Sequence, residues 1–316
     1  TSVQPIPTAD VPTITQRDFR LGFSNFPYAA TTEGVTGIYQ AIAEHADIYV
    51  EQFDEATLPW DAALNGTAFP AKFQERLDRA VSNRVQGVPL VLVVMPLSLG
   101  RDGIAAPLSG TLPTRLQDKP LDDPAYVLAF SNYVERLAQQ LGADYLVTGL
   151  EVNELYLNNP DVWPAYIRFN QDVTRTLRQR LPGLPISQSI TLHSFFSEAA
   201  GDAGHRAAVV ALLETQDFTA VSYYPFLHGA YDDTDAYVQA FDLLAGLTNK
   251  PIAFTESGNI AERLQVRSLG LDMPGTEQSQ NGYITALLER AQRDEYLFVI
   301  NWAARDFDAL TAILPR

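Results

Sequence analysis

Two glutamates that close apolar segments are the strongest candidates for chemistry in this chain. Glu154 comes shortly after the segment 144–150, and Glu256 shortly after the segment 251–254. A carboxylic acid is costly to bury beside such segments unless it has a partner or a function. Two acids placed in this way indicate a paired-carboxylate active site. In glycoside hydrolysis, for example, one acid attacks the sugar and the other protonates the leaving oxygen.

Eight short apolar or β-branched segments, each followed by a helical pattern, must position these acids. The predicted strands are 19–26, 47–53, 90–96, 144–151, 185–191, 218–224, 251–256 and 296–302. The predicted helices are 34–45, 71–85, 124–141, 160–181, 203–214, 234–247 and 276–293, with a short closing segment at 307–314. Eight β-then-α units in 316 residues predict a single (β/α)8 TIM barrel, with residues 1–17 as an N-terminal extension. A doubly wound sheet is the alternative, although no G-x-G-x-x-G turn follows a strand.

In such a barrel the functional side chains lie at the carboxyl ends of the strands. The fourth and seventh strand ends carry Glu154 and Glu256, and the other ends supply amide, carboxylate, imidazole and aromatic groups. These are Asn25, Phe26, Gln52, Asp54, Asn153, His193, Tyr223, Tyr224, Asn301 and Trp302. The long segment 97–123 after the third strand is expected to wall a cleft. Glu151 is expected to be a supporting acid, paired with an arginine such as Arg20.

The residues at several strand ends resemble a large clan of (β/α)8-barrel retaining glycoside hydrolases. Asn153-Glu154 on strand four and Glu256 on strand seven look like the clan signature, and residues 151–154 resemble the E-x-x-N-E of its cellulase branch. The segments 221–229 and 254–258 are similar to strands six and seven of the endo-β-1,4-galactanase family. The first strand departs from that family's pattern.

The resemblance implies a role for each of the matching residues. Glu154 would be the acid/base and Glu256 the nucleophile of a double displacement, while Asn153 would bind the sugar 2-hydroxyl. A tyrosine of strand six would donate a hydrogen bond to Glu256. Since side chains alternate along a strand, only one of Tyr223 and Tyr224 can point straight inward, and we expect it to be Tyr224.

Other residues are expected to contact the sugar or to pack beside it. Trp302 would form the floor of the subsite that holds the cleaved sugar, with Asn25, Asp54 and His228 as further substrate contacts. Glu51, Asp54 and Glu55, in the acidic segment 51–55 after strand two, are interpreted first as solvated loop charge, with a sugar contact by Asp54 as the alternative. Neutral packing is the alternative for His228.

Composition limits the partners of the protein. A net charge of −16 and a pI near 4.6 argue against nucleic acid or an anionic membrane as a partner and suit a neutral substrate. The chain has no cysteine, which excludes thiolate catalysis and cysteine-based zinc sites. The polar N-terminal segment would fit a secreted protein, extracellular or periplasmic, whose signal peptide is absent from this chain. A monomer is expected.

These observations predict a retaining glycoside hydrolase that cleaves β-glycosidic bonds of a neutral polysaccharide or oligosaccharide. An endo-acting enzyme of the β-glucan, galactan or mannan class, with no metal and no cofactor, fits best. The alternatives are a barrel enzyme of another reaction class and a non-catalytic carbohydrate-binding barrel. Schiff-base chemistry would need a lysine at a strand end, and Lys72, Lys119 and Lys250 do not provide one. Metal-dependent hydrolysis would need more histidines than the four present.

Overall fold

The computed structural model describes residues 16–196, 203–266 and 271–305, and its centre is a ring of parallel strands. The strands are β1 (Arg20–Ser24), β2 (Ile48–Phe53), β4 (Leu90–Val94), β6 (Tyr145–Val147), β7 (Ile186–Ser187), β8 (Ser189–Thr191), β9 (Thr219–Tyr223), β10 (Ile252–Ser257) and β13 (Phe298–Asn301). The sheet order is β7-β6-β4-β2-β1-β13-β10-β9-β8. Because β7 and β8 are two parts of one strand, the ring closes with eight strands. The predicted (β/α)8 barrel is confirmed.

The fifth strand is interrupted at Gln188, whose side chain forms a buried hydrogen-bond network. The Gln188 side chain is buried and donates to Thr148 Oγ1 over 2.6 Å and to Asn170 Oδ1 over 2.7 Å, and it accepts from the Tyr166 hydroxyl. Gly149 leaves room for this network, since a Cβ there would lie 2.5 Å from Gln188 Oε1. The satisfied amide ties strand five to the end of β6, just before the loop that carries the candidate acids.

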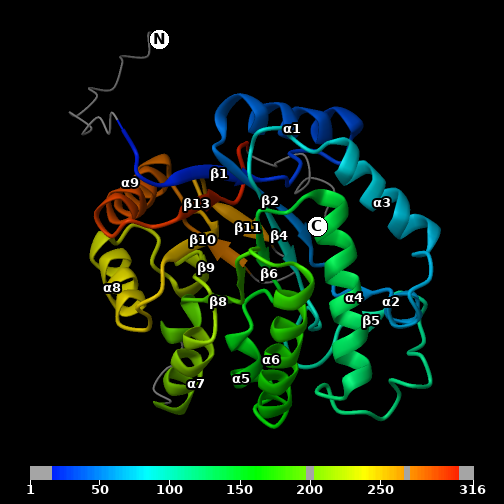
Figure 1. The fold of residues 1–316 in the computed structure, drawn as a ribbon. Helices are drawn as coiled ribbons and strands as arrows, with labels where there is room; N and C mark the ends of the chain where they lie inside the picture. Colours follow the sequence, from blue (N-terminus) through cyan, green and yellow to red (C-terminus); the bar gives the residue numbers. More distant parts are fainter. Residues whose placement is uncertain (1–15, 197–202, 267–270, 306–316) are drawn as a thin grey trace.

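Helices surround the strands, as Figure 1 shows. They are α1 (Thr32–His45), α3 (Ala71–Ser82), α4 (Pro124–Leu141), α6 (Trp163–Arg180), α7 (Ala203–Glu214), α8 (Thr234–Ala245) and α9 (Glu277–Arg293). The start and stop signals read from the sequence act as expected in α4. Asp123 caps its first turn by accepting from the Ala125 N–H, Pro124 occupies the first position, and Gly142 ends it in the left-handed conformation.

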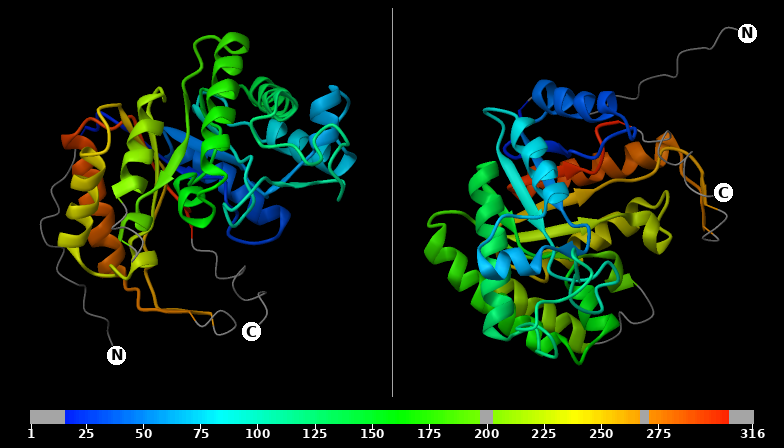
Figure 2. Two further views of the ribbon diagram at one scale, coloured as in Figure 1. Left: turned by 90° about the horizontal axis from the view of Figure 1, so that it is seen from below. Right: turned by 90° about the vertical axis from the view of Figure 1, so that its right-hand side faces the viewer.

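Several short elements were not predicted, and they lie in the connections between the barrel strands. They are β3 (Thr57–Leu58), α2 (Trp60–Asn65), β5 (Ala106–Pro107), α5 (Asn153–Asn158), η1 (His193–Phe196), η3 (Pro225–His228), β11 (Leu264–Val266) and β12 (Leu271–Met273). β3 pairs with β5, which anchors the long segment after β4. β11 and β12 form an antiparallel hairpin that extends beyond the barrel on the side where β10 ends (Figure 2). The predicted segment 307–314 lies outside the described residues, as does most of the predicted extension 1–17.

The predicted fourth strand was too long. β6 ends at Val147, because the next residues bond to strand five without forming a regular ladder: Thr148 N–H donates to Ser187 O over 2.9 Å, and Ser189 N–H donates to Gly149 O over 2.8 Å. The chain then turns at Glu151, so Glu151 lies on a loop and Glu154 on the short helix α5. No described helix is long and apolar enough to cross a membrane.

Candidate active site

Glu256 reaches the barrel interior because β10 contains a β-bulge. The register between β10 and β9 shifts between Phe254 and Glu256, which makes Thr255 an extra residue in the ladder. Phe254 packs outward against Phe241 of α8. In a regular strand Glu256, two residues later, would face the same way. The bulge turns it inward instead, a recurring use of bulges next to active sites.

Two donors hold the Glu256 carboxylate. The Gln52 amide of β2 donates to Oε1, and the Tyr224 hydroxyl donates to Oε2 over 3.3 Å. Burial raises the pKa of Glu256 well above its ordinary value, and the negative charges of Glu151 and Asp54 raise it further, whereas the two donors lower it. Glu256 is only 6% exposed, so its contacts are poorly screened by water.

Glu154 is the second residue of α5 and lies at the same end of the barrel as Glu256. Its side chain is 22% exposed, and Oε1 lies 4.0 Å from Nε2 of His193. Among the described residues Oε1 has no hydrogen-bond partner. Burial raises the pKa of Glu154, the charge of Glu151 raises it further, and a hydrogen bond with Ser194 and the charge of Arg101 lower it. A half-buried acid with a raised pKa suits a proton donor.

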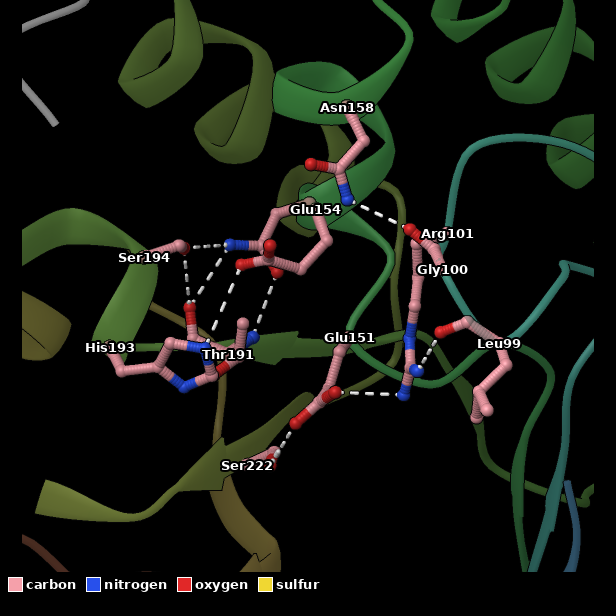
Figure 3. Close-up of polar contacts among 11 residues, drawn as sticks. Leu99, Gly100, Arg101, Glu151, Glu154, Asn158, Thr191, His193, Ser194 and Ser222 are labelled. Carbon is pink, nitrogen blue, oxygen red and sulfur yellow. Dashed lines mark hydrogen bonds and ion pairs between the residues drawn. The ribbon is translucent and has the colours of Figure 1, made fainter. Parts of the chain in front are cut away.

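Glu151 is a third carboxylate at this site and pairs with an arginine as expected, but the arginine is Arg101 and not Arg20. Oε2 accepts from Arg101 over 2.8 Å, and Oε1 accepts from the Ser222 hydroxyl over 2.7 Å (Figure 3). Arg20 instead donates to the Tyr145 hydroxyl over 3.1 Å. Ser222 is the register partner of Glu256, so Glu151 contacts the residue next to the strand-seven acid.

Asn153 is fully buried and supports the chain next to Glu154. Its amide donates to Thr191 O over 3.0 Å and to Ser194 Oγ over 2.7 Å, and its Oδ1 accepts from Thr191 N–H over 2.8 Å. The Thr191 hydroxyl in turn lies 2.6 Å from Nδ1 of His193, the residue that faces Glu154. Both amide N–H groups of Asn153 are therefore used within the protein, and its contact with a sugar hydroxyl stays a prediction that would involve Oδ1.

Of the two strand-six tyrosines, Tyr224 contacts Glu256 and Tyr223 faces away. Tyr223 is fully buried, packs edge-to-face on Phe241 of α8, and has its hydroxyl 3.0 Å from Nε2 of His228. His228 stacks on Phe196 with ring centroids 4.6 Å apart. Burial lowers the pKa of His228. The structure therefore places Tyr223 and His228 in packing beside the site.

An aromatic group lies at the ends of β1, β9 and β13. The Trp302 ring lies 5.1 Å from Phe26 and 6.5 Å from Tyr224, measured between ring centroids. Its backbone is fixed on both sides, since Trp302 N–H donates to Ser257 O over 2.7 Å and its carbonyl accepts from the Ser24 hydroxyl. A partly exposed indole ring fixed beside Glu256 can offer a flat apolar face to a sugar.

Solvated loop charge was the wrong interpretation for one residue of the acidic segment 51–55. Glu51 is 3% exposed and faces α1, where it accepts from the Tyr39 hydroxyl over 2.7 Å. Asn25 donates to that same hydroxyl over 3.1 Å, which turns its amide toward this buried network. Burial raises the pKa of Glu51. Asp54 is half-buried at the site, and burial raises its pKa as well.

Sequence reasoning assigned no role to Gln52 or Arg101, which contact the acids at this site. Gln52 was recognised at a strand end, but an amide there carries no signal that it contacts a carboxylate on the opposite side of the barrel. Arg101 lies in the long segment after β4, where spacing says nothing about its partner.

Comparison with known proteins gives similarity in structure only. No protein-family model matches the chain, and no curated protein matches it in sequence. The GH53 catalytic domain of Ignisphaera aggregans is 15% identical with a TM-score of 0.57, covering 95% of this chain and 87% of that chain. A GH5_18 structure from Streptomyces cattleya in complex with GlcNAc is 16% identical with a TM-score of 0.65, covering 95% and 74%.

A GH5_18 variant from Bifidobacterium longum subsp. longum, in complex with Manβ1-4GlcNAc, is also 16% identical, with a TM-score of 0.64 over 90% of this chain and 69% of that chain. At identities this low, the structural similarity establishes a shared fold and nothing finer. The fold is the (β/α)8 barrel found in glycoside hydrolases of families GH5 and GH53, which confirms the predicted resemblance at the level of the fold.

Proposed function

We propose that this protein is a retaining glycoside hydrolase that acts on β-linked, neutral oligosaccharides or polysaccharides. The observation that carries the proposal is the different environment of its two candidate catalytic acids. Glu256 accepts from two donors, as a nucleophilic carboxylate should. Glu154 is more exposed and has an oxygen without a hydrogen bond among the described residues, so its ionised form is less stabilised, as a proton donor requires, whereas burial and neighbouring charges raise the pKa of both acids.

The reaction would run in two steps. Glu256 attacks the anomeric carbon and forms a glycosyl ester while Glu154 gives its proton to the leaving oxygen. Glu154, now ionised, then takes a proton from water as the water attacks the anomeric carbon and releases Glu256. Tyr224 and Gln52 orient the nucleophile through both stages, and Trp302 supports the sugar that is being cleaved.

The substrate class follows from the groups at the strand ends. Trp302, Phe26 and Tyr224 present aromatic surface, which suits the C–H face of a pyranose. Arg101 is already paired with Glu151, and Arg76, near Asp54, is paired with Glu55, so neither arginine makes a good receptor for an anionic sugar. We propose endo-action on a β-glucan, galactan or mannan, and secretion of the protein. The disaccharide in the Bifidobacterium complex makes β-mannosides a sensible member of any substrate panel.

Azide rescue tests the proposal and both roles at once. Glu256→Gly and Glu154→Gly would each be assayed with 2,4-dinitrophenyl β-glucoside, galactoside and mannoside, with azide. In the nucleophile variant azide attacks the substrate directly and gives an α-glycosyl azide. In the acid/base variant azide attacks the glycosyl ester and gives a β-glycosyl azide. The exposed Glu262→Gly serves as the matched control and should keep wild-type hydrolysis.

Undiminished hydrolysis by Glu256→Gly would refute the assignment of the nucleophile. Absence of wild-type hydrolysis on every glycoside and on soluble β-glucan, galactan and mannan would favour a non-catalytic carbohydrate-binding barrel. Product lengths from those polysaccharides separate endo-action, which gives a ladder of oligosaccharides, from exo-action, which gives one small product.

A further inference from the structure

The loop after β4 is held against the helix that carries Glu154. Asn158 of α5 donates to Gly100 O over 2.8 Å, and Asn159 donates to Asp102 O over 2.7 Å. These two bonds flank Arg101, as Figure 3 shows for the Asn158 contact. Arg101 is therefore fixed by backbone contacts on both sides and does not reach the site as a free, flexible side chain.

Arg101 and Glu151 are both in backbone conformations that residues other than glycine rarely adopt. Their φ angles are +49° and +52°, in the left-handed region. The two side chains meet at 2.8 Å with only 14% and 16% of their surface exposed, and Glu151 also accepts from Ser222. Such strain persists only where the surrounding structure enforces it, and it gathers at functional sites.

Glu151 is surrounded by charged and titratable groups from six parts of the barrel. They are Arg101 after β4, Asp54 after β2, Glu154 on α5, His193 after β8, Tyr224 after β9 and Glu256 on β10. Three of these neighbours are acids. The charge of Glu151 is therefore felt by both candidate catalytic glutamates.

We propose, on the basis of the glycosidase function proposed above, that Arg101 and Glu151 are positioning residues for that reaction. Arg101 fixes Glu151 as a third carboxylate between the catalytic glutamates, and the charge balance of the pair sets the pH range over which Glu154 keeps its proton. The two members act in opposite directions. The negative charge of Glu151 raises the pKa of Glu154, and the positive charge of Arg101 lowers it.

The test is a direct titration of Glu154. The protein is labelled with carboxyl-¹³C glutamate, and the Glu154 signal is assigned by its loss in Glu154→Gln. The titration midpoint is then measured in the wild type, Glu151→Gln, Arg101→Gln and the double variant. We expect a fall of about half a pH unit or more in Glu151→Gln, a rise of similar size in Arg101→Gln, and a midpoint near the wild type in the double variant.

Matched variants separate charge from structure. Arg101→Lys keeps the charge and should keep the wild-type midpoint, which preserves the test if Arg101→Gln does not fold. Arg168→Gln removes an arginine from a distant ion pair with Asp122 and should shift nothing. In folded variants, the alkaline limb of kcat/KM should move in the same direction as the midpoint.

Opposed shifts would support the pair, and unchanged midpoints in folded Glu151→Gln and Arg101→Gln would overturn it. A shift in the same direction in both single variants would also overturn it, because that is the result of a general structural disturbance. The glycosidase proposal fails separately, through absence of wild-type hydrolysis, and the NMR titration still reports on the pair in that case.

Discussion

Replacing Tyr224 by phenylalanine removes one oxygen and with it one of the two donors to Glu256. The hydrogen bond is 3.3 Å long, which is longer than most O–H···O contacts. A hydrogen bond to a charged group contributes about 1.5–3 kcal/mol, and this length places it near the lower limit. A loss of about 1.5 kcal/mol corresponds to a fall of roughly tenfold in kcat/KM. The ring keeps its contacts with Trp302 and Phe226.

The pH profile separates this effect from a general loss of packing. Because the Tyr224 hydroxyl lowers the pKa of Glu256, its removal should move the acidic limb of kcat/KM to higher pH. Tyr223→Phe is the matched control. It removes the neighbouring hydroxyl, which contacts His228, and should cost about 1 kcal/mol of stability without moving the limb. An acidic limb that moves equally in both variants, or in neither, would show that the Tyr224 hydroxyl does not stabilise the ionised form of Glu256.

Three further predictions concern the acids and the aromatic group. Glu154→Gln should lower kcat/KM by roughly 10²–10⁴-fold for glycosides with poor leaving groups, which need a proton, and far less for dinitrophenyl glycosides. Equal losses across a leaving-group series would contradict the role of Glu154 as the acid. Glu256→Gln should stabilise the protein increasingly as the pH rises from 4.5 to 7. The pKa of Glu256 is raised in the folded protein, so at a pH above the ordinary glutamate pKa the wild type loses folding free energy that the variant does not lose. A difference in Tm between variant and wild type that is independent of pH would contradict this. Trp302→Ala should remove about 1–2 kcal/mol of transition-state stabilisation, which lowers kcat/KM roughly 5–30-fold. Steady-state kinetics should show little change in the pH profile.

The arrangement of the barrel could be predicted from the sequence because it depends on local patterns. Each strand is a short apolar segment, and each of the long helices has a clear apolar face or cap, as Asp123, Pro124 and Gly142 show for α4. Once the strands were counted, the rule that active sites lie at their carboxyl ends brought Glu154 and Glu256 to one face. Alternation along strand six limited the tyrosine that contacts Glu256 to one of Tyr223 and Tyr224, and the expected one, Tyr224, makes the contact.

What the sequence could not predict depends on contacts between distant segments. The bulge at Thr255 turns Glu256 inward, yet a regular strand with the same residues would have turned it toward the helices. Glu51 looks like loop charge until Tyr39 of α1 is placed against it. The Arg101–Glu151 ion pair joins residues on different loops, and neither composition nor spacing selects Arg101 over Arg20.

Trapping the covalent glycosyl-enzyme intermediate would show directly whether Glu256 is the nucleophile. A 2-deoxy-2-fluoro sugar with an activated leaving group slows both steps, but it slows release of the sugar more, so the glycosyl ester accumulates on the nucleophile. Intact mass followed by peptide mapping would be carried out with the glucosyl, galactosyl and mannosyl reagents. We expect one added fluorosugar per chain, attached at Glu256 and absent from Glu256→Gly. A label on any other residue, or active hydrolysis of the matching natural glycoside with no label at all, would contradict it.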